Sequence, residues 1–313
     1  MNNTFKGYLC GIIAAICYGT NPLGVLLLYR DGINSNSAVF YRYILAMLIL
    51  FGMMIVQRKS FAVSKRELLI VSILGILFSA SSLTLFISFQ YMDAGIASTM
   101  LFVYPVMVAV LMIVLFKERL SIVTMLSIAL AIGGITLLYH GGNGSTLSAA
   151  GVALVMVSSL TYAIYIITLN KSKLRMSVIK LTFYITLVGT IAIGLFSLTS
   201  QSNHIQWLSR PEMWGYAMIL ALVPTVISLV MMTIAIKSVG STPSAIMGAL
   251  EPVTAVIIGI TIFGEAFTER LAVGIVLILS AVMLIIISKA FNLHSFANAI
   301  VYVGHKVKKW RWH

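Results

Sequence analysis

The sequence predicts an all-α membrane protein of ten transmembrane helices in two inverted five-helix repeats. Hydrophobic residues make up 60% of the chain and charged residues 9%, with a mean hydropathy of +1.04. This composition lies far outside that of soluble globular domains. Apolar segments of roughly twenty residues recur along the chain, the length that crosses a hydrocarbon core about 30 Å thick. One apolar segment also occurs twice, and an alignment of the two copies without gaps matches their proline and their final glutamate.

The ten predicted helices are joined by short links, which favour antiparallel neighbours. Their predicted ranges are 7–28, 37–56, 68–90, 95–116, 121–139, 149–169, 178–199, 213–236, 243–263 and 270–288. The link 139–149, rich in Gly and Ser, is the predicted joint between the halves. We therefore expect a first repeat over 1–140, a second over 148–288, and a basic tail over 289–313.

The distribution of Lys and Arg predicts the orientation. With a cytoplasmic N-terminus, seventeen of the 21 basic residues lie on the inner side, three on the outer side and one, Arg42, inside the membrane. This asymmetry places both termini in the cytoplasm. The formal net charge of +13 is then a topology signal, and no nucleic-acid partner is expected.

The repeat is clearest between the stretch Met247–Glu265 and the stretch Met100–Glu118. Without gaps, Pro105 aligns with Pro252 and the two final glutamates align with each other. Apolar matches are common among membrane segments, but matched prolines and glutamates are not. Because each repeat crosses the membrane an odd number of times, the second copy is inverted, an arrangement that places a binding site near the midplane.

These residues make the chain resemble the EamA-type transporters of the drug/metabolite transporter superfamily. The resemblance rests on the Pro-to-Glu spacing in both halves, on the pair Glu251-Pro252 and on Arg42, and it covers about residues 7–288. It implies a central cavity that moves a small metabolite by alternating access, and the family leans towards efflux. A mostly apolar lining with one acid suits amino acids or related amphipathic compounds, and only Arg42 is available for a phosphate.

Glu251 is the first candidate for coupling or substrate binding. It lies about 12 Å along its helix by the 1.5 Å rise per residue, and an acid at that depth costs at least about 2.5 kcal/mol. It could carry a proton or bind an amine, or it could be a hydrogen-bonded acid that ties two helices together. If coupling exists, it depends on Glu251, because no chain of intramembrane acids is present; protons are therefore a possible partner.

Arg42 is the second candidate, about five residues inside the outer end of its helix. It could bind an anion or act as a gating charge. Alternatively, its side chain could snorkel to the outer headgroups, with Tyr41 and Tyr43 at interfacial depth.

Other candidates form three groups. Polar residues at helical spacing are expected to line the cavity, although such residues also pack helices together. The prolines are expected to break helices, and the glutamates that end the repeated stretches are expected to be helix-end or gate elements. The cavity set is Tyr18, Asn21, Ser81, Thr84, Tyr104 and Tyr162; the breaks are Pro22, Pro105 and Pro252; the gate residues are Glu118 and Glu265.

No nucleotide-binding loop and no HExxH motif occur, and all five histidines fall outside the predicted helices, so we expect no enzyme, metal or cofactor. The tail could lie on anionic lipid or be a disordered topology signal. We expect a carrier in the bacterial inner membrane, in contact with lipid and a small-molecule substrate. A membrane sensor without flux and a lipid-linked metabolite flippase are the alternatives; the oligomeric state is not predicted.

Overall fold

The computed structural model describes residues 3–117, 122–139, 148–172, 174–199, 201–239, 244 and 247–287. Within these ranges the chain is helical with short links and contains no strand. Among the described residues, eight apolar helices are long enough to span a membrane, and two shorter ones, Ile122–Leu138 and Leu250–Phe263, fall where the remaining two spans were predicted. The predicted all-α, ten-span fold is confirmed.

The helices follow the predicted order, and several spans consist of two helical pieces. Their bounds are α1 Asn3–Gly19, α2 Asn21–Arg30, α3 Ser35–Val56, α4 Lys65–Ser88, α5 Ala94–Leu101, α6 Tyr104–Phe116, α7 Ile122–Tyr139, α8 Ala149–Ser172, α9 Val178–Phe196, α10 Pro211–Ala221, α11 Ser228–Val239 and α13 Leu250–Phe263. A last helix covers Glu269–Ile287.

Each predicted helix-breaking proline lies in the first turn after an interruption. Pro22 opens α2 after a turn at Thr20, and Pro105 opens α6 after the turn that ends α5. Pro252 lies in the first turn of α13, just after the turn at Ala249. Proline fits there because the first helical N–H groups have no intrahelical acceptor to lose.

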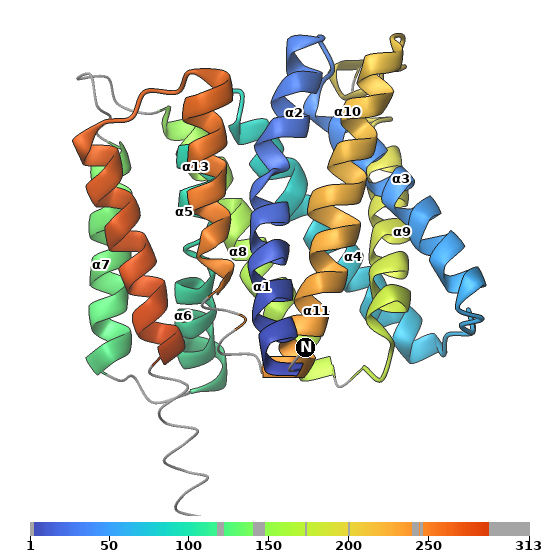
Figure 1. Cartoon of the computed structure of the whole chain (residues 1–313), viewed down its shortest axis with the longest axis horizontal. Coiled ribbons are helices and arrows are strands. Elements are labelled where there is room, and N and C mark those ends of the chain that lie inside the picture. Colours follow the sequence, from blue (N-terminus) through green and yellow to red (C-terminus); the bar gives the residue numbers. More distant parts are fainter. Residues whose placement is uncertain are drawn as a thin grey trace, which may run out of the picture.

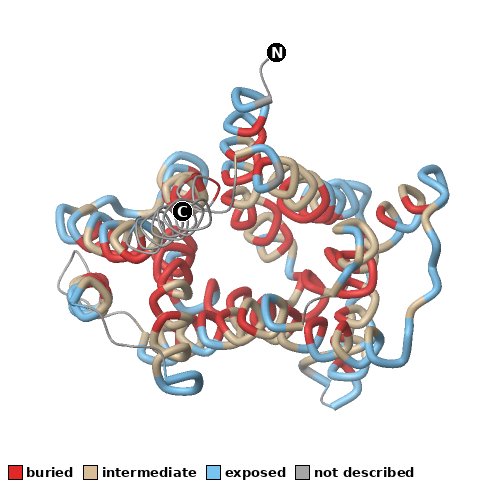
Figure 2. The backbone as a smooth tube through the Cα atoms, turned by 90° about the horizontal axis from the view of Figure 1, so that it is seen from below, coloured by how far each residue is buried: buried red, intermediate tan, exposed pale blue. Residues whose placement is uncertain are grey.

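The helices stand roughly side by side along one axis, with α2, α10 and the end of α13 at the end opposite the N-terminus (Figure 1). The broadest contacts join α1 with α11, α4 with α8, α3 with α9, and α4 with α9, followed by α5 with α13. Seen along the helices, exposed positions lie mostly on the outer perimeter (Figure 2). Among the large apolar side chains of the described residues, Val56 and Ile122 are 83% and 85% exposed. Large apolar side chains exposed in this way are expected on a surface that faces lipid.

Candidate functional site

A cavity of about 250 Å³ lies between α1, α6, α8, α11 and the stretch leading into α13. Its lining residues are Ala15, Tyr18, Tyr104, Tyr162, Ile166, Ser228, Leu229, Met232, Ile236, Ser244, Gly248 and Glu251. The lining residues extend from Tyr18, near the middle of the span formed by α1 and α2, toward the C-terminal end of α11. That end of α11 packs against the start of α1. The cavity therefore occupies the half of the bundle that holds the N-terminus.

Glu251 is placed on the cavity by the interruption before α13. The turn at Ala249 restarts the helix, so Glu251 falls in the first turn of α13. At this level α1 lies very close to α13, because a Cβ at Gly19 would be 2.5 Å from the backbone oxygen of Glu251. Gly19 thus lets α1 bring the neighbouring Tyr18 to the same cavity.

Tyrosine rings form much of the remaining wall. The rings of Tyr104 and Tyr162 meet edge to face, with centroids 4.7 Å apart and an interplanar angle of 88°. Tyr165 stacks on Tyr162 at 5.6 Å and also contacts Phe78. Edge-to-face and offset contacts are the arrangements that aromatic pairs prefer. They hold Tyr104 and Tyr162 in place beside the acid.

Arg42 is buried inside the bundle with 1% of its surface exposed, and it does not line the cavity. Its Nε donates a hydrogen bond to the Thr225 hydroxyl at 2.9 Å, and its guanidinium lies 5.5 Å from the centroid of the Phe86 ring. Its Nη2 has no hydrogen-bond partner in the described part of the chain. The snorkelling interpretation is therefore wrong, because neighbouring helices enclose the side chain on the path to the headgroups.

Arg42 does not line the cavity, but its charge is close enough to interact with two residues that do. Arg42 interacts electrostatically with both Glu251 and Tyr18. In the described part of the chain, no ion pair joins Arg42 to Glu251, and Arg210 pairs with Asp31. The site thus combines an acid on the cavity with a fixed positive charge nearby.

Sequence reasoning missed the residue that holds Arg42. Thr225 lies in a π-helical segment, Leu222–Ile227, between α10 and α11. Such π segments are rare and often lie at functional sites. The local signal was Pro224, which stands inside a predicted span and cannot supply a helical N–H. The identity of the partner, 183 positions from Arg42, has no local signal.

Three residues expected at the cavity do not line it. Asn21 lies at the break between α1 and α2, where its amide donates to the backbone oxygen of Tyr18. Ser81 bonds Ser158, joining α4 to α8, and the Thr84 hydroxyl donates to oxygens of its own helix. The packing role of small polar residues accounts for Ser81 and Thr84.

Glu265 links the end of α13 to the start of α5. Its carboxylate accepts hydrogen bonds from the backbone N–H groups of Ala94, at 2.7 Å, and Gly95, at 3.1 Å. Burial raises the pKa of Glu265, and these two hydrogen bonds oppose the increase. The corresponding residue in the first half, Glu118, lies outside the described residues, as does the basic tail.

At the end opposite the cavity, a polar network that we call the latch joins residues 31–41 to residues 203–210. The Asn34 N–H donates to the side chain of Gln206 at 2.6 Å, and the Asn36 amide donates to the Asn203 backbone oxygen at 2.6 Å. Further contacts are Asn34 to the His204 backbone oxygen, the Gln206 N–H to the Ser37 hydroxyl, the Tyr41 hydroxyl to the Gln206 backbone oxygen, and the ion pair of Arg210 with Asp31.

Comparisons with known proteins agree with this architecture. An uncharacterized transporter of Archaeoglobus fulgidus is 28% identical over 195 residues, which cover 62% of this chain and 68% of the relative. The uncharacterized inner membrane transporter YicL of Salmonella typhimurium is 25% identical over 91% of this chain and 96% of its own. A solved crystal structure superposes with a TM-score of 0.63 at 14% identity, over 89% of this chain and 95% of that one, and so shows the fold alone.

The family match covers nearly all of the helical part of the chain. The EamA-like transporter family matches residues 5–140 and again residues 149–287, once in each half. The two matches bracket the link between α7 and α8, where the sequence placed the joint. This chain therefore belongs to the EamA-like transporter family, whose members named above are membrane transporters.

Proposed function

We propose that this transporter exports a small amphipathic metabolite that carries an amine, such as an amino acid or a related compound. The observation that carries the proposal is Glu251, the one charged residue among the described lining residues of the cavity. A buried carboxylate attracts a protonated amine, which restores the favourable interactions that the acid loses on leaving water.

The size and lining of the cavity support the same class of substrate. A volume of about 250 Å³ holds about eight non-hydrogen atoms with their hydrogens, if each takes roughly 30 Å³, the volume per water molecule in the liquid. An ammonium group placed at Glu251 would lie beside the rings of Tyr18, Tyr104 and Tyr162, whose faces favour cations.

The asymmetry of the bundle supports transport by alternating access. The cavity lies toward the N-terminal side, whereas the latch holds residues 31–41 and 203–210 together on the opposite side. With both termini in the cytoplasm of a bacterium, the site would load from the cytoplasm. Rocking of a repeat over 1–140 against a repeat over 148–288 would then open the latch and release the substrate outside.

Glu251 also offers a simple means of proton coupling. A carboxylate that gives up its amine ligand on the outer side would take up a proton there and release it inside, where the next ligand displaces it. This exchange requires one acid at the site, and Glu251 lies there. Facilitated diffusion is the outcome if Glu251 does not titrate during the cycle.

The test is substrate release from proteoliposomes that contain the purified protein and a mixed panel of metabolites. We expect selective loss of amine-bearing compounds, accelerated by a pH gradient. Glu251→Gln should abolish the gradient-driven part and should also weaken exchange of amine-bearing compounds, because it removes the carboxylate that binds the amine. Glu212→Gln, the same change at an exposed position, is the matched control and should leave release unchanged. If the folded protein releases no compound faster than empty vesicles do, a sensor or lipid-flipping role replaces the carrier.

A further inference from the structure

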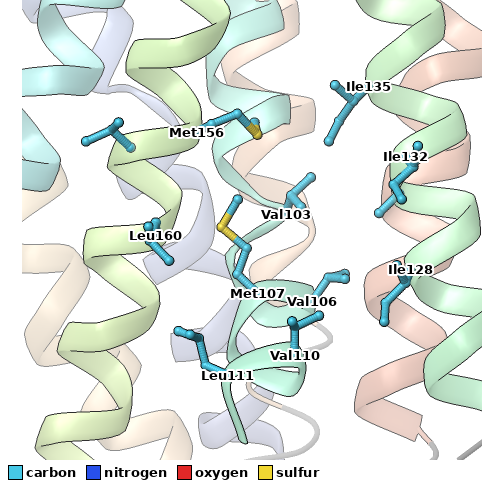
Figure 3. Close-up of a pocket in the computed structure, with 12 residues that line it drawn as sticks. Val103, Val106, Met107, Val110, Leu111, Ile128, Ile132, Ile135, Met156 and Leu160 are labelled. Carbon is cyan, nitrogen blue, oxygen red and sulfur yellow. The ribbon is translucent and has the colours of Figure 1, made fainter. Parts of the chain in front are cut away.

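A second concave site lies outside the cavity, in the space between α6, α7 and α8. Its volume is about 390 Å³, and every residue that lines it is Val, Leu, Ile, Met or Ala. Figure 3 shows Met107 and Leu111 from α6 at the back, Ile128 and Ile135 from α7 on one side, and Met156 and Leu160 from α8 on the other. We call this site the aliphatic groove.

The aliphatic groove is continuous with the lipid-facing surface. Three of its lining residues, Ile132, Val157 and Leu160, are 59%, 47% and 41% exposed. They belong to the perimeter that faces hydrocarbon in a membrane-spanning bundle. No lining side chain offers a hydrogen-bond donor or a charge, so a polar solute would lose its hydrogen bonds on entering.

The dimensions match one hydrocarbon chain. The lining runs from Val103 to Leu111 along α6, about 12 Å at 1.5 Å per residue, compared with about 15 Å for half of a hydrocarbon core. The volume of about 390 Å³ holds about thirteen methylene groups, if each takes roughly 30 Å³. The groove is therefore long enough for most of one acyl chain.

We propose that the aliphatic groove binds one acyl chain of a bilayer phospholipid as a defined site, distinct from the shell of lipid that surrounds the whole bundle. A chain seated here contacts α6, α7 and α8 at once. It therefore buries more apolar area per methylene than a chain that lies against a single helix, and this favours residence. The chain also lies beside the break between α5 and α6, where Val103 contributes to the groove.

The proposal does not depend on what the protein transports. The cavity and the aliphatic groove share α6 and α8 but have no lining residue in common. Contact between Tyr104 and Tyr162, on those two helices, closes the wall on the cavity side. Lipid binding can therefore be measured whether or not flux is found.

The test uses the full chain in vesicles of phosphatidylcholine that carries a photoreactive diazirine in the middle of one acyl chain. Crosslinked positions are mapped by mass spectrometry. We expect crosslinks on the groove faces of α6, α7 and α8 to exceed those on the exposed face of α9 by about tenfold, the ratio expected if two additional methylenes are buried.

Two variants of equal bulk separate a site from general lipid contact. Ile132→Trp places an indole in the aliphatic groove and should lower groove crosslinking by about the same tenfold factor. Ile191→Trp, at a position that is 54% exposed outside the groove, should leave it unchanged. Both positions are partly exposed, so neither change forces a ring into a closed core. Crosslinks spread evenly over all exposed helices, equal effects of the two variants, or groove crosslinks that join two copies of the chain would each overturn the proposal.

Discussion

The hydrogen bond from Arg42 to Thr225 makes the sharpest energetic prediction. Thr225→Val keeps the shape of the side chain and removes the oxygen that accepts from Nε at 2.9 Å. The guanidinium, 1% exposed, would then have unpartnered donors at both Nε and Nη2. A hydrogen bond to a charged group contributes about 1.5–3 kcal/mol. We expect the free energy of unfolding to fall by that amount relative to a control.

The control is Thr233→Val on α11, which also loses a hydroxyl, one that donates only to the Leu229 oxygen of its own helix. Unfolding by SDS in mixed micelles, followed by tryptophan fluorescence, measures both variants. Thr225→Ser should retain most of the stability, because it keeps the acceptor. In an Arg42→Met background, Thr225→Val should cost no more than the control. Equal losses for Thr225→Val and Thr233→Val in the native background would refute the reasoning.

Three further perturbations test other contacts. Gly19→Ala should destabilise the protein by about 1–3 kcal/mol through overpacking, whereas Gly52→Ala, with open space around its Cβ, should be neutral or stabilising, as measured by the same SDS titration. Because burial raises the pKa of Glu265, its ionisation opposes folding, and stability should decline as pH rises through that pKa; Glu265→Gln should remove this part of the pH profile. Asn36→Ala should weaken the latch by about 1 kcal/mol. In a background with Met232→Cys and with Cys10 and Cys17 replaced by Ala, it should raise labelling of the new cysteine by a thiol reagent added on the latch side about fivefold. Unchanged labelling would contradict the role of the latch.

Hydropathy predicted the fold closely because each span is a local property of the chain. The helix predicted over 149–169 is observed as Ala149–Ser172, and the one predicted over 178–199 is observed as Val178–Phe196. The lipid thickness sets a minimum length for such segments, so little depends on distant residues. The helix breaks were equally readable, because proline marks them locally.

The contacts of the polar residues were harder to predict, because they depend on which helices meet. An arginine near a helix end fits both a headgroup position and a buried one, and only the packing of α3 against the π-helical segment decides for Arg42. Likewise, a serine stripe fits both a cavity and a helix interface, and Ser81 joins α8. Tyr18, Tyr104, Tyr162 and Glu251 do lie around one cavity, which remains a proposed substrate site.

The latch has a consequence for which state the empty protein occupies. Its hydrogen bonds lie at the membrane boundary, where water can replace each of them at a net cost of about 0.5–1.5 kcal/mol. A total of about 2.7 kcal/mol is enough to keep 99% of molecules closed on that side. For a carrier that alternates, a ligand arriving from the latched side would meet a competent site in about one molecule in a hundred, so its apparent affinity would fall by that fraction. Unequal apparent affinities on the two sides of the membrane would then arise from a network far from the binding residues, even with identical chemistry at the site in both states.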